Sequence, residues 1–244
     1  MRFRLARDDN LDYRITILIT MLLLAADTSG KHGSIALAEC GAHDECKILE
    51  VVPLQGGTFS AQLVPQIAAL LAKYGFGKRD IGAFAVASGP GSFTGLRVGL
   101  AAIKALAEVL EKPIAAVSLL EAVATASRSD RNIVAALDAG RNEVYAAECE
   151  IRNGEARLIS ERLMSREQLF ESARNATIRT PDQSLAEAAR LQGLRLEQIE
   201  HPRSDIIARL GWRKIQRRQT VSPEELEANY IRRSDAEIFA RTNY

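Results

Sequence analysis

The alternation of apolar and polar residues along the chain predicts strands and helices in a regular order. The apolar run at 22–26 ends in Asp27 and a polar turn, which is typical of a central strand. Two amphipathic stretches follow after short turns, and they predict a three-stranded antiparallel meander. The predicted elements of the first half are strands at 22–26, 34–39, 46–52, 83–87 and 114–117 and helices at 58–74, 94–111 and 119–127.

The same pattern partly restarts in the second half of the sequence. The apolar segment 133–137 ends in Asp138, just as 22–26 ends in Asp27, and in both places an amphipathic strand follows a polar turn. A repeat of this size predicts two related α/β halves built on the same hairpin. The further predicted elements are strands at 143–150, 156–162, 176–179 and 195–200 and helices at 165–173, 183–192 and 203–218.

The first twenty residues stand outside this repeat. Residues 15–26 follow a basic stretch and loosely resemble a signal peptide, but Asp27 closes the run and no convincing cleavage site follows. We interpret the run as a buried strand, with Met21 as a candidate natural start. The predicted organisation is a disordered or mis-assigned extension at 1–20, a first half at 21–128 and a second half at 129–244.

The composition and charge of the chain limit the classes of function that it can have. With 244 residues, 47% of them hydrophobic, the chain can bury a core of its own. Its 32 basic and 31 acidic residues nearly cancel, whereas a protein that bound nucleic acid without a partner would more often be strongly basic. The three cysteines form no CxxC pair, and no apolar run reaches the ~20 residues that span a bilayer. We therefore expect a cytoplasmic protein without a membrane segment that acts with a protein partner.

Two aspartates at the ends of buried strands are the first candidates for chemistry. Asp27, with Thr28 and Ser29, could orient a hydrated metal ion or face a phosphate, and Asp138 holds the equivalent place in the second half. We predict that these four residues oppose one another across a cleft and bind a nucleotide. The alternative is that both aspartates cap hairpin turns. The glycine-rich stretch 88–95 matches no Walker or dinucleotide pattern, so its phosphate signal is weak.

Metal binding and nucleophilic catalysis have little support. The pattern Cys40-x2-His43-x2-Cys46 offers three soft ligands, but no fourth lies nearby and the spacing fits no common zinc site. The chain has only three histidines, with no HExxH motif and no arguable Ser-His-Asp or Cys-His arrangement. We expect no metal and no catalytic residue.

The predicted helices at 58–74 and 94–111 carry apolar residues around most of their circumference. A helix of this kind must be covered on more than one side. The covering surface belongs either to the core of this chain or to a partner protein, and the sequence pattern does not distinguish these two possibilities. Gly95, Gly99 and Ala102 make a small-residue edge that another helix could approach closely.

The stretches 24–29 (Leu-Ala-Ala-Asp-Thr-Ser) and 86–99 (Val-Ala-Ser-Gly-Pro-Gly-Ser-Phe-Thr-Gly-Leu-Arg-Val-Gly) strongly resemble the TsaB (YeaZ) family. The likeness covers roughly 21–150 well and returns in Asn229-Tyr230-Ile231-Arg232. It implies an α/β fold of the actin-like (ASKHA, ribonuclease H-like) type, with two related βββαβα-type halves. It also implies a role in threonylcarbamoylation of the adenosine beside the anticodon in tRNAs that read codons starting with A.

The resemblance further implies that the chain is not itself the enzyme. The related transferase TsaD carries a His-Met-Glu-Gly-His metal motif, and Leu119 and Val123 stand at its two histidine positions here. The implied role is a non-catalytic subunit without a cofactor of its own, although a nucleotide at the boundary with TsaD stays open. An actin-like ATPase or small-molecule kinase that uses Asp27 and Asp138 is the alternative, and a metallopeptidase is the third choice.

The implied partners are TsaD, bound through the helices of the first half, and the TsaE ATPase, with tRNA reached through the complex. The same helices could bury themselves in a homodimer of the isolated chain. A large charged residue at Gly99 or Ala102 is expected to block pairing with TsaD while the monomer stays folded. The predicted interface residues are Leu63, Ile67, Leu70, Gly95, Gly99, Ala102, Ile103 and Leu106.

Overall fold

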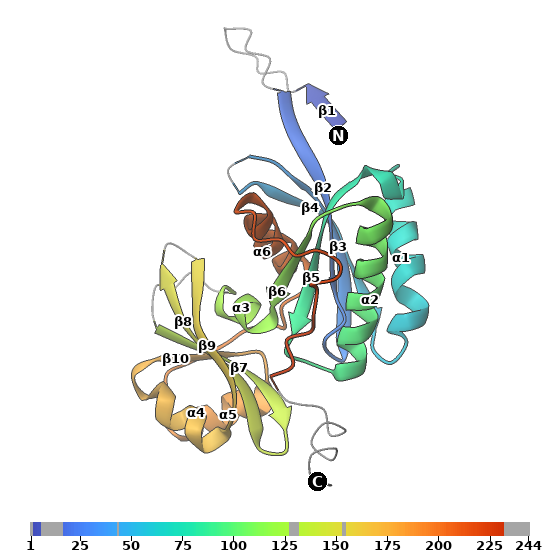
Figure 1. Cartoon of the computed structure of the whole chain (residues 1–244). Helices are drawn as coiled ribbons and strands as arrows, with labels where there is room; N and C mark the ends of the chain where they lie inside the picture. Colours follow the sequence, from blue (N-terminus) through green and yellow to red (C-terminus); the bar gives the residue numbers. More distant parts are fainter. Residues whose placement is uncertain (1, 6–16, 43, 127–131, 153–154, 232–244) are drawn as a thin grey trace, which may run out of the picture. The chain divides into compact units, whose positions relative to one another are not determined.

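The computed structural model divides into two compact units, each built on one β-sheet with helices (Figure 1). The first unit comprises Met1–Ala87, Thr94–Ala116 and Arg203–Glu227, and the second comprises Ser88–Phe93, Val117–Pro202 and Ala228–Tyr244. The structure describes residues 2–5, 17–42, 44–126, 132–152 and 155–231. Within that part of the chain, no helix has both the length and the apolar character needed to cross a bilayer.

The sheet of the first unit has the strand order β4-β3-β2-β5-β6. Strands β2, β3 and β4 form the predicted antiparallel meander, and β5 runs parallel to β2. Residues 23–26 of β2 are completely buried, as expected of a central strand covered on both faces. The bounds are β2 Ile17–Asp27, β3 His32–Cys40, β4 Cys46–Gln55, β5 Ile81–Gly89 and β6 Ile114–Ser118.

Strand β2 begins earlier than predicted. A short strand, β1 (Arg2–Leu5), pairs antiparallel with its first residues, and Leu5 lies opposite Ile17. Residues 2–5 and 17–20, which we expected in a disordered extension, therefore form β-structure. The β-branched residues Ile17, Ile19 and Thr20 favour this strand. The rest of the expected extension, 6–16, lies outside the described residues.

Three helices accompany the first sheet: α1 (Phe59–Lys73), α2 (Phe93–Leu110) and α6 (Ser204–Gln216), with a short 3-10 turn at Lys78–Asp80. In Figure 1, α1 and α2 lie on one side of the sheet and α6 lies on the other. Helix α6 belongs to this unit, although we had assigned it to the second half. Its apolar face covers a sheet face that would otherwise be open, and the packing is close: a Cβ on Gly211 would lie 2.4 Å from the Cβ of Ala85.

The sheet of the second unit has the strand order β11-β10-β7-β8-β9. Strands β7, β8 and β9 repeat the antiparallel meander of the first unit, and β10 and β11 continue the sheet in parallel. Residues from β7, β8, α4, β10 and α5 form one apolar core. The bounds are β7 Asn132–Gly140, β8 Glu143–Arg152, β9 Glu155–Ser165, β10 Thr177–Thr180, β11 Leu196–Gln198, α3 Leu119–Ala124, α4 Arg166–Ser172 and α5 Gln183–Leu191, with a 3-10 turn at Ala173–Asn175.

Candidate functional site

The turn after β2 holds Asp27, Thr28 and Ser29 as buried polar residues. Asp27 Oδ1 accepts hydrogen bonds from the backbone N–H of Ser29, at 2.9 Å, and from the Ser29 hydroxyl, at 2.6 Å. The Thr28 hydroxyl donates to the carbonyl oxygen of Gly95 at 2.7 Å, which ties the turn to the first turn of α2. The carboxylate therefore organises the turn itself, and the predicted contact with a nucleotide stays a prediction.

Asp138 lies two residues before the end of β7 in the second unit and makes the same local bond. Its Oδ1 accepts from the backbone N–H of Gly140 at 3.2 Å, two residues on, as Asp27 accepts from Ser29. Both aspartates thus act as turn-capping residues, in agreement with the alternative we weighed. The sequence repeat reflects a turn that is built in the same way in both units, and the opposition of Asp27 and Asp138 across a cleft stays a prediction.

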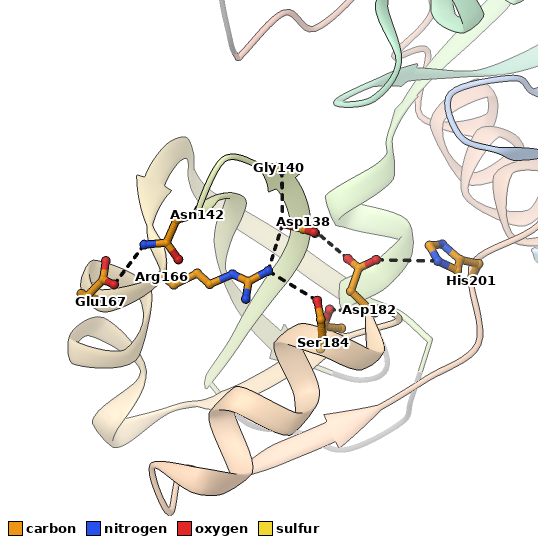
Figure 2. A network of polar contacts seen from close by, with 9 residues as sticks. Asp138, Gly140, Asn142, Arg166, Glu167, Asp182, Ser184 and His201 are labelled. Carbon is orange, nitrogen blue, oxygen red and sulfur yellow. Dashed lines mark hydrogen bonds and ion pairs between the residues drawn. The ribbon is translucent and has the colours of Figure 1, made fainter.

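A polar network surrounds Asp138 (Figure 2). Arg166 reaches from the start of α4 to Asp138 Oδ1 at 3.3 Å and to the Ser184 hydroxyl at 3.4 Å. Asp182 Oδ2 accepts from the Asp138 backbone N–H at 2.7 Å, while its Oδ1 lies 3.9 Å from Nε2 of His201. These contacts fix the β7–β8 hairpin to the start of α5 and use the Asp138 carboxylate as a structural acceptor.

Asn142 and Glu167 extend this network at the hairpin turn. The Asn142 side-chain amide donates to Glu167 Oε1 at 3.0 Å. Hydrogen bonds from Ser165 and Asn142 lower the pKa of the Glu167 carboxyl below its ordinary value. The charged form of Glu167 is therefore favoured beside the turn, where it helps to hold the hairpin.

The glycine-rich stretch 88–95 is held by contacts with Val117 and with the segment around Asn229 and Tyr230. The Ser88 hydroxyl donates to the carbonyl oxygen of Val117 at 3.2 Å, and the Ser88 carbonyl accepts from the Asn229 backbone N–H at 2.7 Å. The rings of Phe93 and Tyr230 pack in a tilted arrangement, with centroids 5.1 Å apart and planes at 35°. The C-terminal segment thus packs along this stretch, a contact that no local sequence pattern indicated.

The start of α3 is the segment that, by the resemblance, is equivalent to the metal motif of the related transferase. Ser118 caps α3 by accepting from the backbone N–H groups of Leu120 and Glu121, and its hydroxyl donates to Glu161. The other carboxylate oxygen of Glu161 accepts from the Asn229 side-chain amide at 2.7 Å. Leu119 and Val123, which by the resemblance stand at the two histidine positions, are buried aliphatic side chains.

The structure corrects the predicted interface on α1 and α2. Six of the eight predicted residues face the interior of the first unit, and only two are half-exposed. A buried side chain cannot contact a partner directly, so the buried residues form core and the outward face must carry any interface. The buried residues are Leu63, Ile67, Leu70, Gly95, Gly99 and Ile103, and the half-exposed ones are Ala102 and Leu106.

Gly99 is a close-packing position against the Asp27–Ser29 turn. A Cβ at Gly99 would lie 2.3 Å from Thr28 Oγ1, so a large residue there would disturb the fold rather than test an interface. We expect Gly99→Ala to lower the free energy of unfolding by roughly 1–3 kcal/mol, measured by urea denaturation. In a Thr28→Ala background the obstructing hydroxyl is gone, so the cost should shrink. An equal cost in both backgrounds would contradict this packing.

Comparisons with known proteins agree with the resemblance. The family model described as "TsaD: tRNA N6-adenosine threonylcarbamoyltransferase" matches residues 51–219. The "tRNA threonylcarbamoyladenosine biosynthesis protein TsaB" of Haemophilus influenzae is 31% identical over 226 residues, which cover 87% of this chain and 94% of that protein. The protein of the same name from Bacillus subtilis is 34% identical over 135 residues, which cover 55% of this chain and 57% of that protein.

Solved structures show the same fold. "YeaZ from Pseudomonas aeruginosa" superposes with a TM-score of 0.69 at 24% identity, covering 86% of this chain and 99% of that one. A second structure, titled as an uncharacterized protein with similarity to peptidase YeaZ from Pseudomonas aeruginosa, gives a TM-score of 0.68 at 27% identity, with coverage of 87% and 100%. The predicted α/β, actin-like fold of two related halves is confirmed. Together with the near-complete match to the Haemophilus influenzae protein, it shows that the chain belongs to the TsaB (YeaZ) family of tRNA threonylcarbamoyladenosine biosynthesis proteins.

Proposed function

We propose that this chain is a non-catalytic subunit that supports threonylcarbamoylation of tRNA by binding the TsaD transferase. The names of its relatives support the pathway, since TsaB proteins of Haemophilus influenzae and Bacillus subtilis are described as tRNA threonylcarbamoyladenosine biosynthesis proteins. The nearly neutral charge of the chain supports action through a protein partner, with tRNA reached through the complex.

The observation that carries the proposal lies at the start of α3. Leu119 is 7% exposed and Val123 is completely buried, and neither side chain has an atom that can coordinate a metal ion. The hydroxyl of Ser118, beside them, already caps the helix and holds Glu161. By the resemblance, the residues that bind a metal ion in the related enzyme are replaced here by residues that pack, which favours a role in binding.

The outward faces of α1 and α2 support a protein interface in the first unit. The outward face of α1 consists mainly of small apolar residues, and exposed small apolar residues recur along α2 between the exposed Arg97 and Glu108. Small residues let another helix approach closely, and exposed apolar surface is typical of interaction sites. We propose that TsaD binds here, that TsaE joins the pair, and that the isolated chain forms a homodimer through the same faces. Beyond Phe93 at the start of α2, the exposed apolar residues are Ala61, Val64, Pro65, Ala68, Ala69 and Ala72 on α1 and Ala101, Ala105 and Val109 on α2.

Reconstitution tests the proposed function. TsaD, TsaE, tRNA and the threonylcarbamoyl donor are combined with and without this chain, and transfer of the threonylcarbamoyl group to tRNA is followed. We expect transfer when TsaD and this chain are both present, and none from this chain alone. Transfer by this chain without TsaD, or equal transfer in its absence, would contradict the proposal. ATP turnover by the isolated chain that Asp27→Asn abolishes would favour a kinase or ATPase instead.

A further inference from the structure

Two cysteines meet where β3 ends and β4 begins. Cys40 is the last residue of β3, Cys46 is the first of β4, and the two are direct partners in the antiparallel register. Their Sγ atoms are 2.6 Å apart. Both thiols are free and buried, at 0% and 6% exposure. The pair therefore forms a dithiol across neighbouring strands.

The hairpin places these residues at a position suited to a disulfide. The Gly41 backbone N–H donates to the carbonyl oxygen of Glu45 at 2.8 Å, so the hydrogen-bonded pair lies one step beyond the cysteines, toward the turn. Cys40 and Cys46 then form a non-hydrogen-bonded pair, for which the Cα separation is about 4.5 Å. Disulfides join cysteines whose Cα atoms are roughly 4.4–6.8 Å apart, so little backbone movement is needed.

Side chains of helix α6 donate hydrogen bonds to the end of the β3–β4 hairpin that holds the two cysteines. The carbonyl oxygen of Gly41 accepts from Nε1 of Trp212 at 3.1 Å and from the side-chain amide of Gln216 at 3.3 Å. Arg209, also on α6, donates to the carbonyl oxygen of Cys46 at 3.0 Å. These bonds hold the two cysteines in register only while the first unit is folded.

We propose that Cys40 and Cys46 are a redox-active dithiol, which a low-molecular-weight disulfide such as oxidised glutathione converts to an intramolecular disulfide. This modification is independent of the proposed role in tRNA modification. It differs from a metal site, because only two sulfur ligands of the described residues meet here.

The exchange proceeds in two steps. The Cys46 thiolate attacks one sulfur of the oxidant, the oxidant's disulfide breaks, and one glutathione leaves as a thiolate that takes up a proton. The Cys40 thiolate then attacks Cys46 Sγ and displaces the second glutathione. Two protein thiols are oxidised to one disulfide, and one glutathione disulfide is reduced to two thiols.

The surroundings indicate which thiol reacts first. A hydrogen bond from Cys40 and the nearby Arg209 guanidinium lower the pKa of Cys46, whereas the pKa of Cys40 is raised by the same hydrogen bond and by burial. Ala42, Asp44 and Glu45 beside the pair are exposed, so local opening of the hairpin end admits the oxidant. Cys149 is buried on β8, and burial raises its pKa to about 12, which makes it a poor nucleophile.

Redox titration of the full chain tests the proposal. A Cys149→Ser variant, which keeps only Cys40 and Cys46, is equilibrated in glutathione buffers of increasing oxidised fraction, both folded and in urea. Free thiols are then alkylated under denaturing conditions and counted by mass spectrometry. Because the fold holds the two thiols together, we expect the folded chain to form the disulfide at a glutathione ratio at least about tenfold more reducing than the unfolded chain.

A midpoint for the folded chain equal to that of the unfolded chain, or more oxidising, would overturn the proposal. Accumulation of a stable mixed disulfide with glutathione in place of the internal disulfide would also overturn it. If Cys149→Ser prevents folding, peptide mapping of the unaltered chain decides the question. We expect a cross-linked Cys40–Cys46 peptide with Cys149 alkylated, and a Cys149 peptide joined to either of the other two would contradict the assignment.

Discussion

Ala105→Glu is expected to weaken the association with TsaD by at least about a hundredfold, or about 3 kcal/mol. Ala105 is exposed on the outward face of α2, one turn from exposed Ala101 and exposed Val109. In the proposed complex the added carboxylate would lose its water without gaining a cation, and its bulk would hold the facing helix away. Glutamate is a good helix former, so α2 itself should be unaffected.

The measurement is the dissociation constant of the purified pair, with urea denaturation of the isolated variant as the check on folding. Ala105→Ser keeps the residue small and should bind TsaD nearly as the unaltered chain does. Leu191→Glu places the same charge on α5 of the second unit, where Leu191 is 88% exposed, and should leave binding unchanged. Unaltered affinity of a folded Ala105→Glu variant would contradict the proposed interface, and an equal loss from Leu191→Glu would show that the effect is not local.

Arg179→Met is expected to lower the free energy of unfolding by about 3 kcal/mol. Arg179 lies on β10 and is completely buried, and it donates to Glu197 Oε2 through Nε, at 3.0 Å, and through an Nη atom, at 2.6 Å. Its other Nη donates to the carbonyl oxygen of Ala124 at the end of α3. Methionine fills similar space but leaves the Glu197 carboxylate and the Ala124 carbonyl without these donors.

Urea denaturation measures this loss, and an exposed ion pair supplies the matched control. Arg162 pairs with Glu148 on neighbouring strands, with side-chain exposures of 52% and 40%, so Arg162→Met should change stability by less than about 1 kcal/mol. Adding Glu197→Gln to Arg179→Met should recover part of the loss, because the carboxylate charge is then gone. Equal effects of Arg179→Met and Arg162→Met would show that burial does not strengthen the Arg179 pair.

The order of strands and helices could be predicted from the sequence because it depends on local periodicity. The apolar runs before Asp27 and Asp138 each gave a central strand, and both aspartates cap the turn that follows, through a bond to the N–H two residues on. These bonds involve neighbours in the chain, so the repeat in the sequence was enough to reveal the two related units.

The residues of the predicted interface could not be placed from the sequence. Helix α2 is apolar on most of its surface, so periodicity does not say which side meets the sheet. Packing decided it: Gly99 lies against Thr28, and Ile103 is completely buried, which leaves Ala101 and Ala105 outward. The interface on α1 and α2 therefore stays a prediction, and the sequence could not distinguish the inward from the outward residues of α2.

By itself, the sequence determined the element types and the two-unit repeat, because each depends on residue identity or short-range spacing. Only the tertiary structure decided that α6 joins the first unit, that Arg179 is buried beside Glu197, and that Cys40 faces Cys46. These facts depend on strand register and on packing between segments far apart in the chain. Such contacts depend on which helix or strand covers each apolar face, and the pattern of apolar residues along the sequence does not determine this.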